Sequence, residues 1–369
     1  MRSILTLVAL SACAAAPSIL AIRAPLATSA GGPADLLAFT VANGTEIEKT
    51  FSLEHQLVAQ KIQLEGEGAG LLSQQGLEVA SRIDLSVLDA FTKVEAGRPL
   101  ELQRQFKHCA LHVDLTTTDA RGTKTPDSAD ADTPLQSKSV VFTWVPEEKG
   151  YGRYYDHGES LEEYLAGLSE DLDLRCLLPE RAAQKGSAQQ GSEWSIDPIR
   201  LVDVFVAGGE TPLGFVQGGG GTFARVLTAG VGGQLQEVFG GTVKGNVSAR
   251  WTETREASLE SAGARFAVVQ LTVAIETERE RSDTAGPPSS GEESADARKV
   301  ERSGIHWKFD GSGTLIWNLT AGRFETFDLV GHEEVTSDLT LDLGGVRSRQ
   351  VLTMAGSLKI GAKAGPKKK

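Results

Sequence analysis

The stretch LEVASRIDLSV, residues 77–87, decides the fold of this chain. Apolar and polar side chains alternate along it, which is the pattern of a β-strand with one buried face and one solvated face. Such strands are typical of antiparallel sheets, because parallel strands are generally buried on both faces. The apolar positions are Leu77, Val79, Ile83, Leu85 and Val87, and the polar positions are Glu78, Arg82, Asp84 and Ser86.

The same alternation returns in the second half of the chain, at 267–275, 335–343 and 352–360. Strands that span a membrane alternate as well. Here the turns carry long acidic insertions and the aromatic residues form no regular girdles, so we expect a soluble fold. The apolar positions are Ala267, Val269, Leu271, Val273 and Ile275, then Val335, Leu339, Leu341 and Leu343, then Leu352, Met354, Leu358 and Ile360.

Helical signals are confined to two segments. Leucines at helical spacing predict a helix over 159–178, ended by Pro179. Asp197-Pro198 is typical of an N-cap followed by proline at the first helical position, which predicts a short helix at 198–206. The expected fold class is therefore α+β and predominantly antiparallel β. The helically spaced positions of the first segment are Leu161, Leu165, Leu168, Leu172 and Cys176.

The predicted strands form two β-rich halves, 36–179 and 194–362, each interpreted as a curved sheet or half-barrel. Each half contains an insert that is poor in apolar residues, at 119–139 and at 279–304. Neither insert can bury enough surface to offset the entropy lost on ordering, so we expect both to be mobile loops. A basic tail, 363–369, follows the second half.

Glycine is abundant, yet no cofactor loop is predicted. Gly218–Thr222 lacks the Lys-Ser/Thr pair of a P-loop, and no βαβ unit follows Gly66-Glu67-Gly68-Ala69-Gly70, which is read as a hairpin turn. The glycine-rich segment 208–245 is interpreted as an apolar loop on the sheet or across a cavity mouth, or else as an irregular connection.

The N-terminal segment, residues 1–24, is predicted to be an export signal, because Arg2 precedes an almost unbroken run of apolar and small residues. Three outcomes stay open. A peptidase cuts near Ala24 or as late as Ala30, Cys13 is lipidated, or the segment remains as an uncleaved anchor. Each of them places the folded part in the periplasm, at the cell surface or outside the cell.

The net charge limits the classes of binding partner, and the cysteine content limits the possible disulfides. The net charge is −12, and removal of the leader with its two arginines lowers it to −14. Such a surface repels phosphates, so nucleic-acid binding is not expected. In an oxidising compartment Cys109 and Cys176 either form a disulfide or remain two separate buried thiols.

No catalytic residue, metal site or cofactor is assigned from the sequence. His108 and His112 are four residues apart, which on a strand separates them by about 13 Å, too far to share one ion. There is no Gly-x-Ser-x-Gly motif. The remaining histidines, including His55, are expected at surface or strand-edge positions, and adjacent acids such as Glu170-Asp171 and Glu333-Glu334 are expected to be solvated.

An aromatic group formed by Trp144, Tyr151, Tyr154 and Tyr155 is the candidate ligand-stacking set. These side chains either stack on a sugar or peptide, or pack a hairpin against the helix predicted at 159–178.

Three stretches resemble a loosely defined group of exported, β-rich bacterial proteins. The resemblance implies export and an antiparallel β fold, and it brings no catalytic residues with it. The stretches are Leu168–Arg175 with Leu177-Leu178-Pro179, then Gly191–Pro198, then Gly313–Trp317 with Gly322-Arg323.

These observations predict an exported, non-enzymatic protein with a binding or structural role in the cell envelope. We expect an apolar ligand on a concave sheet face lined by strands 77–87 and 267–275, with lipid or an envelope protein as partner. Two alternatives stay open. One is a hydrolase-like enzyme with a site dispersed over loops, revealed by convergence of His and acids with Ser or Tyr. The other is a carbohydrate-binding surface protein.

Overall fold

The computed structural model describes residues 37–66, 74–95, 97–156, 165–179, 190–209, 211, 214–215, 239–256, 264–281, 298–343 and 347–367. Within these ranges, no helix has the length and apolar character needed to cross a membrane. The predicted export signal with Cys13 lies outside them. So do residues 282–297 of the second insert and 216–238 of the glycine-rich segment.

Most of the described chain forms antiparallel strands of unusual length. Six strands have 20–22 residues, which at 3.3 Å per residue gives about 70 Å. The strands are β1 (Thr45–Gly66), β2 (Gln74–Glu95), β3 (Arg98–Asp119), β4 (Lys124–Asp132), β5 (Ser139–Val145), β6 (Gly150–Tyr155), β7 (Glu193–Ile196), β8 (Gly214–Phe215), β9 (Thr242–Glu256), β10 (Arg265–Arg281), β11 (Arg298–Asn318), β12 (Arg323–Leu343) and β13 (Arg347–Pro366).

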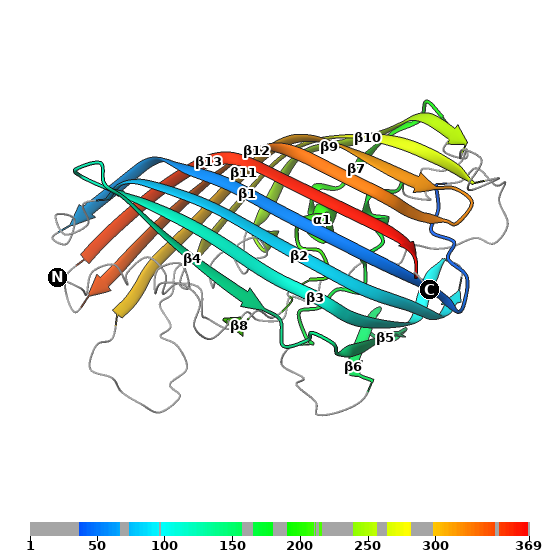
Figure 1. The fold of residues 1–369 in the computed structure, drawn as a ribbon. Helices are drawn as coiled ribbons and strands as arrows, with labels where there is room; N and C mark the ends of the chain where they lie inside the picture. Colours follow the sequence, from blue (N-terminus) through cyan, green and yellow to red (C-terminus); the bar gives the residue numbers. More distant parts are fainter. Residues whose placement is uncertain are drawn as a thin grey trace.

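All these strands belong to one curved sheet, which is not closed (Figure 1). Its order is β6-β5-β3-β2-β1-β13-β12-β11-β10-β9-β7, with β4 beside β3 and β8 beside β4. β1 pairs with β13 from Ile47↔Pro366 to Gly66↔Ser348. The two halves expected as separate curved sheets are therefore continuous, and the fold is almost entirely β rather than α+β.

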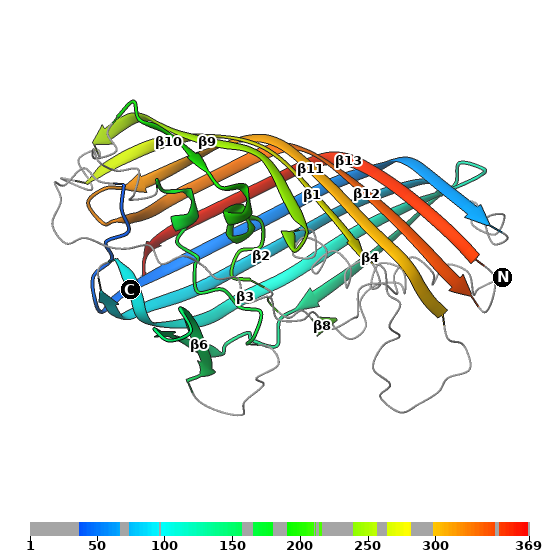
Figure 2. The ribbon, with the colours of Figure 1, turned by 180° about the vertical axis from the view of Figure 1, so that it is seen from behind.

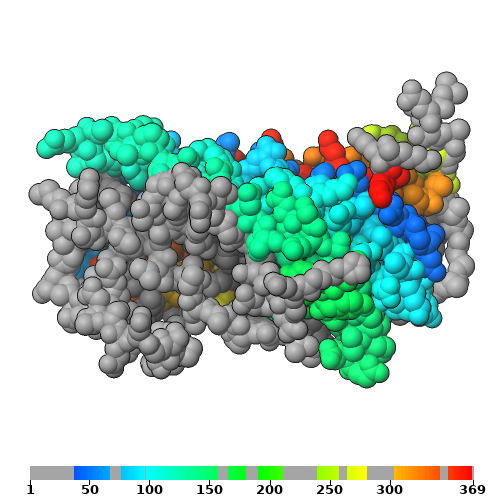
Figure 3. Space-filling view, turned by 60° about the horizontal axis from the view of Figure 1, so that its bottom comes forward, coloured from blue at the N-terminus to red at the C-terminus, as the bar shows by residue number. Residues whose placement is uncertain are grey.

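Residues 165–179 and 190–209, which we call the segment beneath the sheet, lie under the concave side of the sheet (Figure 2), and we call that side the inner face. Viewed from the open side, the green atoms of β5, β6 and this segment gather toward the end of the molecule where β13 finishes (Figure 3). This segment therefore covers one end of the inner face.

The helix predicted at 198–206 is confirmed. A 3-10 turn at Pro198–Leu201 leads directly into α1 (Val202–Phe205). The carboxylate of Asp197 accepts a hydrogen bond from the backbone N–H of Ile199 at 3.1 Å, as expected of an N-cap residue.

The helix predicted at 159–178 is wrong within its described part, 165–178. That part is irregular, with one 3-10 turn at Arg175–Leu177, and Leu174 has a left-handed φ of 53°. Its charged residues are buried with the leucines, so the segment takes an extended path that lets its carbonyls and carboxylates meet charged groups on the sheet. Tertiary contacts have overridden the leucine spacing here.

The prediction that 119–139 is a mobile loop is also wrong. A turn ending at Gly122, with a φ of 80°, leads into β4, which pairs with β3 from Ala110↔Asp132 to Thr118↔Lys124. Asp119 stabilises the turn by accepting hydrogen bonds from the backbone N–H groups of Arg121 and Thr123, each at 2.8 Å. Alanines rather than large apolar residues fill the buried positions of β4.

The predicted alternation is confirmed in 77–87 and 267–275, but not in 335–343, where residues 335–338 are all half-buried and Thr340 is buried beside Leu339. In 77–87 every apolar position is buried except Ile83, which is half-buried, and in 267–275 all five are buried. In the last strand Met354, Leu358 and Ile360 are buried.

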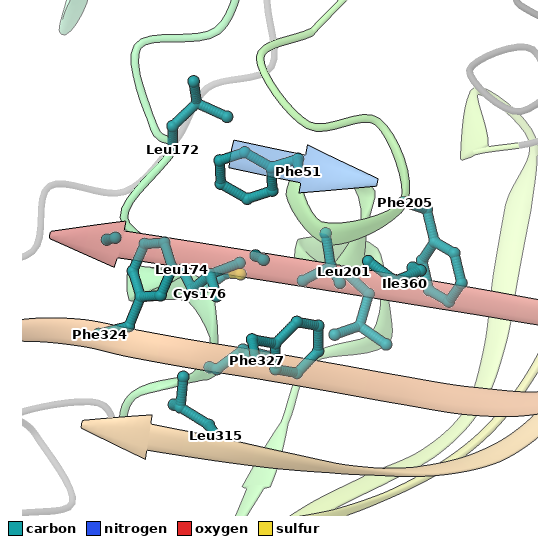
Figure 4. Close-up of a cluster of buried hydrophobic side chains, with 14 of the residues drawn as sticks. Phe51, Leu172, Leu174, Cys176, Leu201, Phe205, Leu315, Phe324, Phe327 and Ile360 are labelled. Atoms are coloured by element: carbon teal, nitrogen blue, oxygen red, sulfur yellow. The ribbon is translucent and has the colours of Figure 1, made fainter. Parts of the chain in front are cut away.

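Two apolar clusters share the inner face. The main core joins the sheet to the segment beneath it, as Figure 4 shows where Leu172, Cys176 and Phe205 approach Phe51 and Phe327. The second, at the other end of the same strands, we call the distal cluster. It consists of Leu77, Val79, Leu111, Val113, Leu115, Ala131 and Met354, all buried.

The convex face is charged. Lys107 on β3 contacts Glu48 on β1 at 2.6 Å, across β2, and Lys124 on β4 contacts Glu78 on β2 at 2.7 Å, across β3. Arg349 pairs with Asp338 at 2.6 Å. A lipid-facing surface would be apolar, so this face is suited to water.

Candidate functional site

A row of polar groups on the inner face begins where β1 and β2 pass from the main core to the distal cluster and ends at the indole N–H of Trp307, which belongs to the main core. On β1, His55 lies between Leu53 of the main core and Leu57, which packs on the distal cluster. On β2, Ser81 follows Val79 of the distal cluster. Glu333 on β12 and Trp307 on β11 continue the row, and we call these four residues the polar band: Ser81, His55, Glu333 and Trp307.

His55 and Glu333 form the centre of the polar band. Nδ1 of His55 lies 2.7 Å from Oε1 of Glu333, and the indole Nε1–H of Trp307 donates to Oε2 at 3.1 Å. His55 is 6% exposed and Glu333 is 1% exposed. When Glu333 is ionised its carboxylate only accepts hydrogen bonds, and Nδ1 is then the nitrogen that carries the hydrogen. The other imidazole nitrogen, Nε2, is buried and has no hydrogen-bond partner within the described part of the chain.

Gly356 allows these two side chains to meet. β13 lies between β1 and β12, and Gly356 is paired with Leu57 on one side and Glu333 on the other. A Cβ at this position would lie 1.7 Å from the carbonyl oxygen of Gln56. This clash shows that the backbones of β1 and β13 approach closely here, and because glycine has no side chain it also places nothing between His55 and Glu333.

Ser81 stands directly opposite His55 in the β1–β2 register and is buried on the same face. β2 is paired with β1 and with β3 around Ser81, so its backbone N–H groups there are used by the sheet. Acyl transfer needs preorganised donors for the oxyanion. The backbone N–H groups of β2 at Ser81 are therefore not free to serve as such donors.

A second polar group on the inner face is an ionic cluster of Lys49, Asp89, Arg104 and Asp173. Nζ of Lys49 lies 2.8 Å from Asp89 and 2.6 Å from Asp173, and the guanidinium of Arg104 donates to both oxygens of Asp89 at 2.7 and 2.9 Å. All four side chains are buried. Arg104 also donates to the carbonyls of Ser169 and Glu170, which fixes the segment beneath the sheet.

The two carboxyls of the ionic cluster shift in opposite directions. Burial alone would raise the pKa of Asp89, but Arg104 and Lys49 outweigh it and lower that pKa. For Asp173 burial dominates over the attraction of Lys49, so its pKa is raised. The cluster therefore holds one firmly ionised carboxylate and one that takes up a proton more readily.

The aromatic candidates lie together on the β5–β6 hairpin. Trp144 and Tyr151 make an edge-to-face contact with centroids 5.2 Å apart, and the guanidinium of Arg98 lies 4.2 Å from the Trp144 ring. The hydroxyl of Tyr151 donates to the carbonyl of Pro99 at 2.6 Å. Tyr154 is 49% exposed, and Tyr155 packs against the main core. These contacts are those of a packed hairpin.

The cysteine and histidine candidates are not brought together. Cys109 and Cys176 are buried free thiols, and burial raises the pKa of Cys109 to about 12. His108 and His112 lie on the exposed face of β3, as expected of a strand. His112 pairs with Asp130 at 2.7 Å, and this hydrogen bond raises its pKa. Among the described residues no three His, Cys, Asp or Glu side chains are grouped to hold a metal ion.

Sequence reasoning missed the residues that matter here. His55 and Glu333 were expected on the surface and are buried, as are Glu170 and Asp171, also expected to be solvated. A signal was present for His55, because it occupies an apolar position of the alternating strand that contains Leu53 and Leu57. The pairing with Glu333 could not be predicted, since 278 positions separate the two residues.

The chain is only weakly similar to known proteins. The chain matches no family model and no curated relative. The COG4313 outer membrane channel from Pseudomonas putida F1 aligns with 91% of this chain and 100% of its own, at 7% identity and a TM-score of 0.19. The transport unit of the autotransporter AIDA-I from Escherichia coli aligns with 88% of this chain and 91% of its own, at 8% identity and a TM-score of 0.22. Scores this low carry no argument about activity.

Proposed function

We propose that this protein is an exported, non-enzymatic component of the cell envelope that holds an alkyl chain on the distal cluster of its inner sheet face. One observation carries the proposal. The residues of the distal cluster, and the described apolar residues that pack against it, all come from strands of the sheet. The main core, in contrast, includes residues from the segment beneath the sheet, such as Leu172 and Phe205.

The physical character of the two faces supports a guest on the inner side. Each methylene group of an alkyl chain removed from water contributes about 0.8 kcal/mol, so a long chain gains substantially by lying among these buried apolar side chains. The charged convex face offers no comparable surface. The N-terminal pattern of Arg2 and the following apolar run supports delivery across the inner membrane.

Binding is tested with mature protein purified from a bacterial periplasm. Native mass spectrometry, followed by solvent extraction, reports whether alkyl-chain lipids travel with the protein. After delipidation, displacement of a fluorescent alkyl probe measures the affinity. We expect co-purified lipid and saturable binding.

Two variants locate the site. Val113→Phe adds apolar volume inside the distal cluster and should weaken probe binding while the protein stays folded by circular dichroism. Gln105→Phe adds the same ring on the exposed face of the same strand and should leave binding unchanged. Absence of any bound alkyl chain would overturn the proposal and leave a scaffold whose own residues cover the distal cluster.

A further inference from the structure

We infer that the His55–Glu333 pair binds the carboxyl head of a long-chain fatty acid whose alkyl chain lies on the distal cluster. The inference rests on the proposed function and names the ligand class of that same surface. Its starting point is the buried Nε2 of His55, which has no hydrogen-bond partner among the described residues. A buried polar atom of this kind is costly unless something satisfies it.

The position of His55 suits a head group. Ser81 stands opposite it on β2, and the strand continues from Ser81 through Val79 to Leu77 within the distal cluster. Four residues of strand cover about 13 Å, so the part of a long alkyl chain nearest its head would lie over these residues. A chain laid along the strands would therefore begin at a polar atom and run over apolar side chains.

The chemistry of the pair selects a carboxyl group. Glu333 fixes the hydrogen of the imidazole on Nδ1, so Nε2 either accepts a hydrogen bond or, when protonated, donates one. A carboxyl group matches both states, because a single proton shared between it and Nε2 satisfies both atoms. The hydroxyl of Ser81 is placed to make a further hydrogen bond to the head.

Other lipid head groups match the His55–Glu333 pair less well than a carboxyl group does. A phosphate would bring up to two further negative charges beside the buried Glu333 carboxylate, with one imidazole to offset them. An ester can only accept a hydrogen bond, so it satisfies Nε2 in one protonation state. The ionic cluster is no competitor for the head, because Lys49 and Arg104 are already paired with carboxylates of this chain.

The test compares palmitate with methyl palmitate, which has the same chain but a blocked head. Displacement of a fluorescent alkyl probe from delipidated mature protein gives both affinities. We expect palmitate to bind at least about tenfold more tightly than its ester, as a charge-assisted hydrogen bond implies. The preference should be lost in the double variant His55→Phe/Glu333→Gln, which leaves no unpaired buried charge. Circular dichroism confirms that this variant is folded.

The matched control is His332→Phe, which changes an exposed histidine on the adjacent position of β12 and should keep the preference. Equal binding of palmitate and its ester by the wild-type protein would overturn the inference and leave the proposed function standing. Failure of both to bind would overturn both. Hydrolysis of p-nitrophenyl palmitate that disappears in Ser81→Ala would also overturn the inference, in favour of an esterase.

Discussion

The ionic cluster and the polar band lie on the same face of the same sheet, yet they differ in one respect. In the ionic cluster, Lys49 and Arg104 are paired with carboxylates of this chain, one of them on the segment beneath the sheet. In the polar band, His55 pairs with Glu333 through one nitrogen and leaves the other without a described partner. The first group is satisfied within the chain and ties the sheet to the segment beneath it, whereas the second leaves one buried nitrogen for the ligand that we propose.

The largest effect is expected when the ionic cluster is broken. Asp89→Ala would leave Lys49 and Arg104 buried beside a single remaining carboxylate, Asp173, so the free energy of unfolding should fall by about 3–5 kcal/mol. Urea denaturation followed by tryptophan fluorescence measures this. Lys124→Ala, which removes an exposed ion pair with Glu78, is the control and should leave the curve nearly unchanged. A small loss in Asp89→Ala would mean that the cluster does not hold the fold.

A smaller effect is expected in the polar band. His55→Phe alone leaves Glu333 buried with one hydrogen bond from Trp307, so it should lower the free energy of unfolding by about 2 kcal/mol. Adding Glu333→Gln removes the charge and keeps an acceptor for Trp307, so part of the loss should be recovered. A double-mutant cycle by urea denaturation gives this coupling. If the two single changes simply add, the two side chains are not a functional pair.

Lowering the pH should change the contributions of Asp89 and Asp173 to stability in opposite directions. The folded pKa of Asp89 lies below its ordinary value of 3.8, so its contribution to stability is present above pH 3.8 and is lost as the pH falls through the folded pKa. The folded pKa of Asp173 is raised, so its contribution is complete below 3.8 and is lost as the pH rises through the folded pKa.

Denaturation curves from neutral pH to acid distinguish the two. The measured quantity is the free energy of unfolding of each variant minus that of wild type. For Asp89→Asn this difference should be unfavourable at neutral pH and should shrink at low pH. For Asp173→Asn it should be less favourable at low pH than at neutral pH. The same pH trend in both variants would contradict the opposite shifts described for this cluster.

The smallest effect concerns the main core, where Cys109 and Cys176 are free thiols. Because ion pairs and apolar contacts hold this end of the sheet, a reducing agent should leave the melting temperature unchanged. Intact mass after alkylation of unfolded protein, without reduction, should show that both thiols react. A protein that resists alkylation until it is reduced would contain the disulfide after all.

Alternation of side chains predicted the strands and their inner faces, because a half-buried strand has only one way to orient its apolar residues. It did not predict β4, since alanines at 129 and 131 are too small to mark a buried face by composition. The irregular path of 165–179 was also missed, because it depends on Arg104 and Lys49, which lie far away in the sequence. The polar band could not be predicted for the same reason, because its members come together only when the strands pair in register.

The pairing of β1 with β13 has a consequence for how the molecule is made. Residues about 300 positions apart must meet before the middle of the sheet exists, and contacts over such separations are slow to form. The centre of the sheet cannot form until β13, the last strand in the sequence, has been made and pairs with β1 and β12. β1 and β12 therefore each keep an unpaired edge until β13 is in place between them.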